Sequence, residues 1–287
     1  MPTEIRRPAV AGAFYEADRT RLVREIEACY LDRRGPGKIP TVNESGPRNV
    51  IGLVNPHAGY VYSGPAAAKG FSAVAEDGRP GCFVILGPNH GRGHYVNAIQ
   101  TSGAWATPLG ESPVHEALAA RLAGLCPGLQ VGAGGFVGEH SLEVQVPFIQ
   151  HLFGLQTPIV PIMMLDQDAS AARAIGNGLA EALAGENAVI VASTDMTHFE
   201  SAELAARQDR ILIDRMEALD PEGLLRERER RGITMCGYGP VAAMLFAALK
   251  LGATQAGMID YTNSGEVSAS REVVAYLSLI VSRGGGE

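Results

Sequence analysis

The sequence predicts an α/β fold, a three-layer sandwich in which helices cover both faces of a mixed, largely parallel central sheet. Short, almost continuously apolar runs alternate with longer amphipathic segments, as buried parallel strands and their covering helices require. Hydrophobic residues make up 46% of the chain, charged residues 19%, and 35 glycines allow many tight turns. No repeat or long proline-rich linker divides the 287 residues, so we expect a single domain over 1–287, with a flexible tail at 282–287.

The expected elements follow the chain in order. An N-terminal helix precedes a loop at 32–48, where glycine, proline and charged residues are frequent. Four apolar runs indicate buried strands at 49–54, 82–87, 158–165 and 188–193. The segments between them predict helices at 64–76, 112–124, 140–153 and 169–184. The C-terminal part adds helices at 201–219 and 237–251, a solvated helix face at 222–231, and strands near 255–262 and 271–281.

Composition excludes several classes of protein. The net charge of −7 is scattered along the chain without a basic stripe, so we expect no nucleic-acid partner. The N-terminus lacks the apolar stretch of a signal peptide, and the longest apolar run, at 273–281, is too short to cross a bilayer. We therefore expect a cytoplasmic protein without a membrane segment. The four cysteines form no CxxC pair, which is typical of reduced thiols.

Three histidines follow three of the expected strands within a few residues of the strand ends. They are His57, His90 and His198. Ligands of open parallel sheets bind outside the carboxyl ends of the strands, where the loops converge, so we expect these side chains to face one crevice. Asp195 precedes His198 by one helical turn, a spacing at which a carboxylate can orient an imidazole for general acid–base catalysis.

Cys236 lies in "CGYGPVAAML", where the glycines and Pro240 indicate the start of a helix. A thiolate at a helix N-terminus is stabilised by the helix dipole, and it is both a nucleophile and a metal ligand. The other cysteines are expected to be buried apolar residues; they are Cys29, Cys82 and Cys126.

Two imidazoles and one further ligand, with positions left open, are typical of a catalytic metal site. A carboxylate as the third ligand indicates non-haem iron, whereas a thiolate favours copper(I) or zinc, so the ligands leave the metal undecided. The glycine-rich stretch 132–138 matches no nucleotide-binding motif. With Glu139 and His140 behind it, this stretch is either a lid that carries polar groups or a capping network for the next helix.

Six segments together resemble the Memo family, also called AmmeMemoRadiSam system protein B. In chain order they are "RRPAVAGAFYEAD", "NPHAGYVYSGPAAA", "ILGPNHG", "EHSLEVQVPFIQ", "ASTDMTHF" and "CGYGPVAAML". The resemblance implies a fold like that of the class III extradiol dioxygenases. It implies a single iron or copper ion at His57, His90 and Cys236, with Asp195 and His198 nearby. Those dioxygenases have a glutamate as third ligand, and Cys236 departs from it.

Two functions follow as hypotheses. The first is a metal-dependent oxidoreductase with His198 as acid–base group, Asp195 as its orienting residue, and Tyr60, Tyr62 and His140 toward the substrate. The second is a non-catalytic protein whose crevice binds a peptide or a metal in a redox or signalling assembly. The resemblance implies a radical SAM protein and an AMMECR1-like protein as partners. A hydrolase with Cys236 as nucleophile and His198 as base is a third reading.

Overall fold

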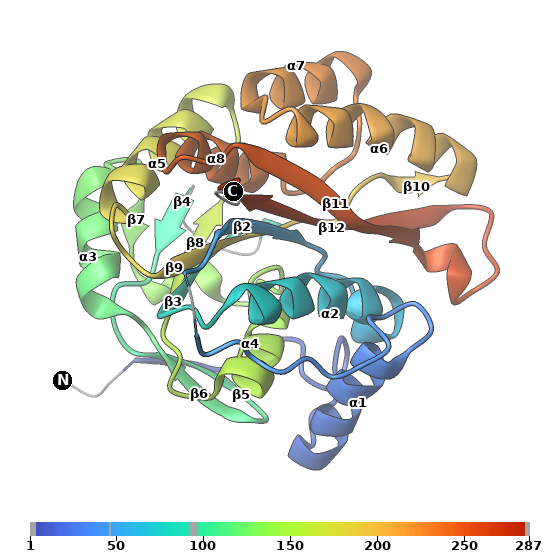
Figure 1. Ribbon diagram of the computed structural model, residues 1–287, viewed down its shortest axis with the longest axis horizontal. Coiled ribbons are helices and arrows are strands. Elements are labelled where there is room, and N and C mark those ends of the chain that lie inside the picture. The colour runs from blue at the N-terminus through green and yellow to red at the C-terminus, as the bar shows by residue number, and fades with distance from the viewer. Residues whose placement is uncertain (1–3, 46, 92–96, 285–287) are drawn as a thin grey trace.

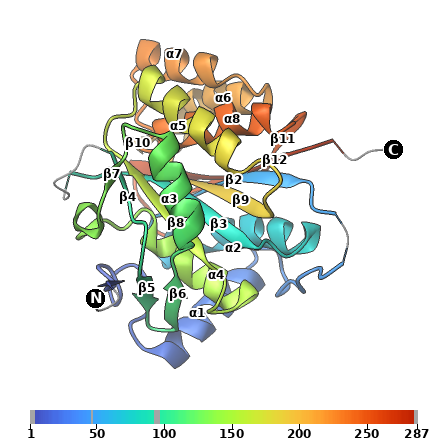
Figure 2. The ribbon, with the colours of Figure 1, turned by 90° about the vertical axis from the view of Figure 1, so that its left-hand side faces the viewer.

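The computed structural model describes residues 4–45, 47–91 and 97–284. A large mixed sheet runs through the molecule, and helices pack against both of its faces (Figures 1 and 2). This arrangement confirms the predicted α/β class and the mixed central sheet. Of the predicted flexible tail, residues 285–287 lie outside the described residues.

Four parallel strands form the centre of the sheet. Their order is β2 (Val50–Asn55), β9 (Ala188–Ser193), β3 (Cys82–Pro88) and β8 (Ile159–Met164). Nearly every residue in them is buried, because helices cover both faces of a parallel sheet. The continuous apolar runs therefore located all four strands to within one residue at each end.

Further strands extend this centre on both sides. Next to β2 lies β12 (Val273–Ser282), which pairs antiparallel with β2, with β11 (Gln255–Asn263) and with β10 (His198–Glu200). On the other side, β4 (Asn97–Ile99) pairs with β8, and β7 (Gln130–Val131) pairs with β4. The strands β4, β7 and β10 have only two or three residues each, too few to produce a periodic pattern.

Two layers of helices enclose the sheet (Figure 2). One layer contains α5 (Ala169–Ala182), α6 (Ala202–Glu217), α7 (Pro221–Arg231) and α8 (Tyr238–Lys250). The other contains α1 (Arg19–Leu31), α2 (Tyr60–Asp77) and α4 (Val146–Phe153). Helix α3 (Glu116–Leu125) packs on α5 and β8. Side chains cap five of these helices at their N-termini. Four of the caps are of residue types that favour this position, Asp18, Asp168, Ser201 and Asp220, and the fifth, on α3, is His115.

Two predicted helices begin later than expected. The segment predicted as a helix from residue 112 first forms β6 (Gly110–Pro113), which pairs with β5 (Ala104–Thr107) in a small sheet completed by β1 (Ile5–Arg6). The segment predicted as a helix from residue 140 begins with a 3₁₀ turn at Glu143–Gln145. The residues before that turn instead form a loop whose side chains reach the sheet edge.

Helix α2 begins earlier than predicted. The predicted helix starts at residue 64, but the helix begins at Tyr60, whose backbone N–H donates to the Phe14 carbonyl at 2.8 Å. Pro65 therefore lies inside the helix, near its N-terminal end. The consequence is functional, because the helix starts only three residues after His57 and fixes the loop that carries it.

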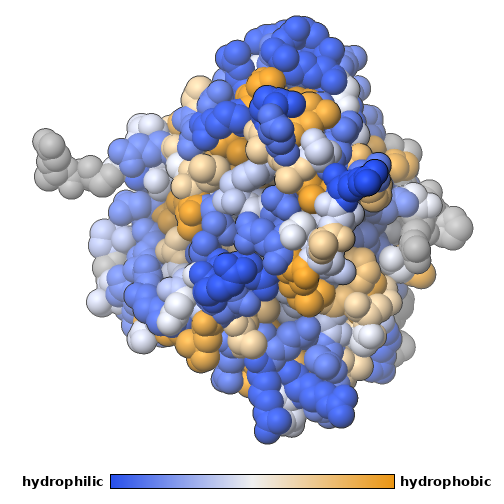
Figure 3. Space-filling view, turned by 90° about the vertical axis from the view of Figure 1, so that its right-hand side faces the viewer, coloured by the Kyte–Doolittle hydropathy of each residue, from blue (hydrophilic) through white to orange (hydrophobic). Residues whose placement is uncertain are grey.

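The surface shown in Figure 3 is mostly hydrophilic, with apolar side chains gathered in small patches. An apolar groove of about 580 Å³ lies between α6 and β11 and is lined in part by Ile213, Met258 and Tyr261. Charged side chains of α6 border the groove, among them Glu203 and Arg207. No large continuous apolar area interrupts this face as drawn, which is ordinary for the surface of a globular protein.

The contact between α5 and α8 depends on Gly176. A Cβ at this position would lie 2.6 Å from the Phe246 Cβ and 2.7 Å from the Ala243 carbonyl oxygen. We expect Gly176→Ala to lower the free energy of unfolding by about 1–3 kcal/mol, because the two helices must separate. Gly124→Ala is the matched control, since its Cβ would meet nothing within 4 Å, and helix propensity predicts a gain of up to about 1 kcal/mol. Urea unfolding measures both, and equal changes would contradict the prediction.

Candidate metal centre

Three neighbouring strands each carry a polar side chain two residues beyond the strand end. His57 follows β2, Asp195 follows β9 and His90 follows β3. Because these strands are adjacent and parallel, the three residues lie at the same edge of the sheet. The His57 and His90 ring centroids are 5.4 Å apart. The predicted convergence of these two histidines is confirmed.

Cys236 joins this group from the turn that precedes α8. Its Sγ lies 3.2 Å from Nε2 of His57, and the ligand atoms of His57, His90 and Cys236 all lie within 4.8 Å of one another. The turn packs tightly on the end of β9, since a Cβ on Gly237 would come within 2.4 Å of the Ser193 carbonyl oxygen. The spacing suits one ion held by three ligands.

Hydrogen bonds determine which nitrogen of His57 carries the proton. The Ser193 hydroxyl donates to the Ser141 carbonyl at 2.6 Å and accepts from the Gln145 amide at 2.9 Å. A hydroxyl has one proton to donate, so Ser193 accepts from Nδ1–H of His57, which lies 3.0 Å away. The lone pair of Nε2 consequently faces Cys236.

Glu139 determines in the same way which ring nitrogen of His90 carries the proton. Its carboxylate accepts from the His90 ring Nδ1 at 2.9 Å and from the His90 backbone N–H at 2.7 Å. Backbone N–H groups of His140 and Ser141 also donate to it. Burial would raise the pKa of Glu139, but the His90 hydrogen bonds hold that pKa well below its usual range. The anionic carboxylate keeps the proton on Nδ1, leaving Nε2 of His90 free, as in carboxylate–histidine–metal arrangements.

The electrostatics of the donors fit a metal cation. Burial lowers the pKa of His57 well below its usual value, and the neighbouring His140 and His90 lower it further, so the ring is neutral. Burial, followed by the nearby Asp195, raises the pKa of the Cys236 thiol to about 12. The thiol therefore keeps its proton unless a cation replaces it. The neutral imidazole of His57, the imidazole of His90 and a displaceable thiol proton form a donor set suited to a transition metal.

Asp195 and His198 are both near the site, but not in the predicted relation. Residues between them are not helical, so the three-residue spacing does not stack them. The Asp195 carboxylate accepts from the His57 backbone N–H at 2.8 Å, and burial raises its pKa to about 6. Thr234 holds His198 instead: its carbonyl accepts from Nδ1 at 3.0 Å and its hydroxyl from the backbone N–H at 2.8 Å. The prediction that Asp195 orients His198 is wrong in this respect.

The Thr234 carbonyl cannot donate, so Nδ1 of His198 must carry a proton. In the neutral ring Nε2 is therefore the basic nitrogen. Strand β12 fixes the segment before this histidine, because Ala275 accepts from the Met196 N–H and donates to the Thr197 carbonyl. Within the described residues, the hydrogen bonds of the Cys236 sulfur go to His57, Asp195 and Thr194, and none goes to His198. The predicted nucleophile–base pair of Cys236 and His198 is therefore not formed, and the imidazole within hydrogen-bond distance of the sulfur is that of His57.

The three residues predicted to face a substrate differ in position. His140 lies beside both histidine ligands, with ring centroids 4.6 Å from His90 and 5.4 Å from His57. Tyr62 is exposed on α2. Tyr60 is 3% exposed and donates its hydroxyl proton to the Val144 carbonyl at 2.7 Å, so it is a core residue and does not line an open pocket. The first turn of α2 directs its ring inward against Tyr15 and Phe148.

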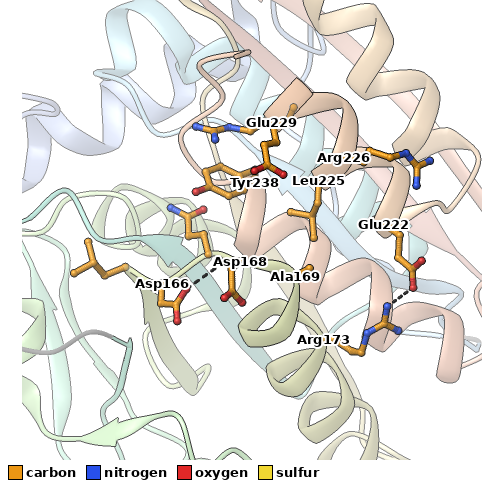
Figure 4. Close-up of a pocket in the computed structure, with 12 residues that line it drawn as sticks. Asp166, Asp168, Ala169, Arg173, Glu222, Leu225, Arg226, Glu229 and Tyr238 are labelled. Atoms are coloured by element: carbon orange, nitrogen blue, oxygen red, sulfur yellow. Dashed lines mark hydrogen bonds and ion pairs between the residues drawn. The ribbon is translucent and has the colours of Figure 1, made fainter. Parts of the chain in front are cut away.

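A separate cavity of about 580 Å³ lies behind the Cys236 turn, between the loop after β8, α5 and α7 (Figure 4). Figure 4 shows Asp166 and Asp168 on one side of it and Glu229 near Tyr238 on the other. Gln167 lines this cavity and also clamps the turn, donating to the Cys236 carbonyl at 3.0 Å and accepting from the Gly239 N–H at 2.8 Å. The position of the Cys236 turn thus depends on Gln167, a side chain from the loop that follows β8.

Glu139 and Thr234 are the residues whose roles the sequence did not predict. In the sequence, Glu139 is only one of several polar residues after the glycine-rich stretch. No sequence pattern links it to His90, which precedes it by 49 residues. Thr234 acts mainly through its backbone carbonyl, and a carbonyl leaves no signal in the sequence.

The fold and the site define an α/β protein with a candidate mononuclear metal centre at the carboxyl edge of its sheet. The family profile described as Memo-like protein matches residues 6–280. A MEMO1 family protein of Methanopyrus kandleri is 42% identical, over 97% of this chain and 99% of that protein. Another, of Thermotoga maritima, is 41% identical over 96% of this chain and 99% of its own length. The chain belongs to the Memo family.

Among solved structures, an uncharacterized protein of Escherichia coli K12 has a similar fold. The TM-score is 0.54 at 16% identity, covering 79% of this chain and 99% of that one. At this level of identity the likeness concerns the fold alone. Within the described residues, no helix is both long and apolar enough to span a membrane.

Proposed function

We propose that this protein binds a single transition metal ion through His57, His90 and Cys236 and uses it in redox chemistry. One observation carries the proposal: one ring nitrogen of each histidine and the Cys236 sulfur lie within 4.8 Å of one another, and Nε2 of His57 is 3.2 Å from that sulfur. Both imidazoles have their Nδ1 proton committed elsewhere, so both present a lone pair. Three protein ligands leave positions for an exogenous ligand, as catalytic sites require.

Iron or copper is the ion that we infer, with zinc as the redox-inactive candidate. A bound ion of this kind supplies Lewis acidity and, for iron or copper, one-electron redox chemistry. The thiolate favours copper(I) or zinc over a purely oxygen-liganded metal, and the imidazoles are compatible with all three. The reduced state of the buried Cys29, Cys82 and Cys126 suits a cytoplasmic protein.

In the enzymatic form of the proposal, the protein is an oxidoreductase related to the extradiol dioxygenases. His198 is the acid–base group, because its Nε2 is the basic nitrogen of a half-buried ring. Asp195 is a positioning residue for the His57 loop, through the bond from the His57 N–H. His140 and Tyr62 are the residues that we place toward a small molecule or peptide in the crevice.

The sulfur ligand favours a second candidate, a non-catalytic protein. A thiolate at the position of the dioxygenase carboxylate alters the redox behaviour of the ion and can itself be oxidised. The crevice would then capture a peptide or a metal within an assembly, with a radical SAM protein and an AMMECR1-like protein as candidate partners. Oxygen consumption by the metal-loaded protein separates the two candidates.

Anaerobic titration with Fe(II), Cu(I) and Zn(II) tests the metal site. We expect one ion per chain in the parent protein, and affinity lower by about 100-fold or more in His57→Ala and in Cys236→Ser, since each loses a direct ligand. His151→Ala and Cys126→Ser are the matched controls, because both residues lie outside the ligand group. Unchanged affinity in both ligand variants would exclude the proposed centre.

A further inference from the structure

Arg6 is a buried arginine near the start of the chain, 7% exposed, whose guanidinium hydrogen bonds reach one distant segment of the chain. Its Nε and Nη2 donate to the Phe136 carbonyl at 3.3 and 3.2 Å, and Nη2 also donates to the Glu139 carbonyl. Its Nη1 lies 2.5 Å from the Glu143 carboxylate. Three of its partners therefore span residues 136–143, the loop that we call the Glu139 loop.

The Glu139 loop is the support of His90. The carbonyl of Glu139 accepts from Arg6, while the carboxylate of the same residue holds both the ring and the backbone N–H of His90. A continuous line of contacts consequently runs from the Arg6 guanidinium through Glu139 to a metal ligand. Gly138, directly before Glu139, has a φ of +75°, a left-handed backbone conformation that glycine adopts without strain.

Glu143 anchors the Arg6 guanidinium on the side away from Glu139. Its carboxylate is 1% exposed and accepts from the Ala9 and Val10 N–H groups, at 2.7 and 3.0 Å, and from the Tyr15 hydroxyl at 2.6 Å. The Arg6 guanidinium also stacks over the Trp105 ring, 4.3 Å from its centroid. These contacts fix the planar fork in one orientation, a constraint that a flexible lysine ammonium cannot reproduce.

We propose that Arg6 is a positioning residue of the metal centre, which sets the orientation of His90 through the backbone of Glu139. Its effect on metal affinity rests on the proposed function, whereas its effect on the His90 ring does not. Removing the fork frees the Phe136 and Glu139 carbonyls, and Glu139 then holds the Nδ1 proton of His90 less firmly. The expected result is a weaker site in a folded protein.

The test compares Arg6→Lys with Arg48→Lys in the full chain. Arg48 is the matched control: it is also largely buried, it donates to the Val50 and Ala188 carbonyls at 3.1 and 2.8 Å, and it lies at the amino ends of β2 and β9, opposite the metal centre. Metal-free ¹⁵N–¹H correlation spectra report the His90 tautomer. Titration with Co(II) alone reports affinity, the ligand field, and the charge-transfer band of a cobalt–thiolate bond.

For Arg6→Lys we expect a mixture of His90 tautomers, Co(II) affinity lower by about ten-fold, altered d–d bands and a retained thiolate band. For Arg48→Lys we expect a single tautomer and an affinity within about two-fold of the parent. A single Nδ1–H tautomer in Arg6→Lys would overturn the inference whatever the metal data show. A parent protein that binds no Co(II) would overturn the proposed function alone. If Arg6→Lys does not fold, Glu143→Gln weakens the same fork and carries the same expectations.

Discussion

Replacement of His198 by glutamine is expected to lower turnover by about 100-fold or more while leaving metal affinity unchanged. His198 is outside the ligand group, and its Nδ1 proton is held by the Thr234 carbonyl, so Nε2 is the nitrogen that can exchange a proton with a substrate. General acid–base catalysis by a positioned side chain contributes rate factors of about 10²–10⁴. Oxygen uptake by the iron- or copper-loaded protein, with a panel of catechols and related phenols, measures the effect.

His151→Gln serves as the control, because His151 lies on α4 away from the ligand group and stacks on Tyr30. Oxygen consumption that needs His198 but not His151 would identify an enzyme and exclude the purely binding role. Equal rates in the parent and in His198→Gln would remove His198 from the chemistry. If the loaded parent consumes no oxygen with any phenol of the panel, the non-catalytic candidate is favoured.

Metal affinity is expected to rise about ten-fold with each pH unit between pH 7 and pH 9. The metal-free Cys236 thiol has a pKa of about 12, so in this range it is protonated and must release one proton when an ion binds. The pKa of His57 is lowered, so that ring is already neutral and releases none. Affinity therefore falls as pH falls. Competition titrations with Co(II) at pH 7, 8 and 9 give the slope, and a pH indicator in weak buffer counts the released proton.

Cys236→Asp is the control for the pH series. The pKa of the buried Asp195 nearby is raised to about 6, so an aspartate at position 236, which is less buried, should be ionised throughout the range. Its affinity should change little between pH 7 and pH 9. A parent affinity that is likewise independent of pH would mean that the thiol is either not a ligand or already ionised.

The elements that could be predicted from the sequence are those whose own residues form a clear apolar pattern. Strands such as β3 and β9 are buried on both faces, so their apolar runs are unbroken and their ends were clear. The hairpin of β5 and β6 was missed because its short strands gain stability from distant contacts, including the stacking of Arg6 on Trp105. The local pattern of apolar residues does not indicate such a contact.

The same distinction applies to the site. His57 and His90 were predictable because the topology of a parallel sheet brings strand ends together whatever the loops contain. The partner of His198 was not predictable, because an i, i+3 spacing has meaning only inside a helix and residues 195–198 are not helical. Tyr60 is a second example. It is close to His57 in the chain, but its place in the first turn of α2 directs its ring into the core.

The pairing of β12 with the segment before His198 has a consequence for how the protein is made. Ala275 bonds to both Met196 and Thr197, and β12 is synthesised after every segment that carries a ligand. On the ribosome, His57, His90 and Cys236 are therefore all synthesised before β12 can pair with the segment that precedes His198. Because domains fold as units, we expect the site to be complete only when the whole domain, β12 included, has folded.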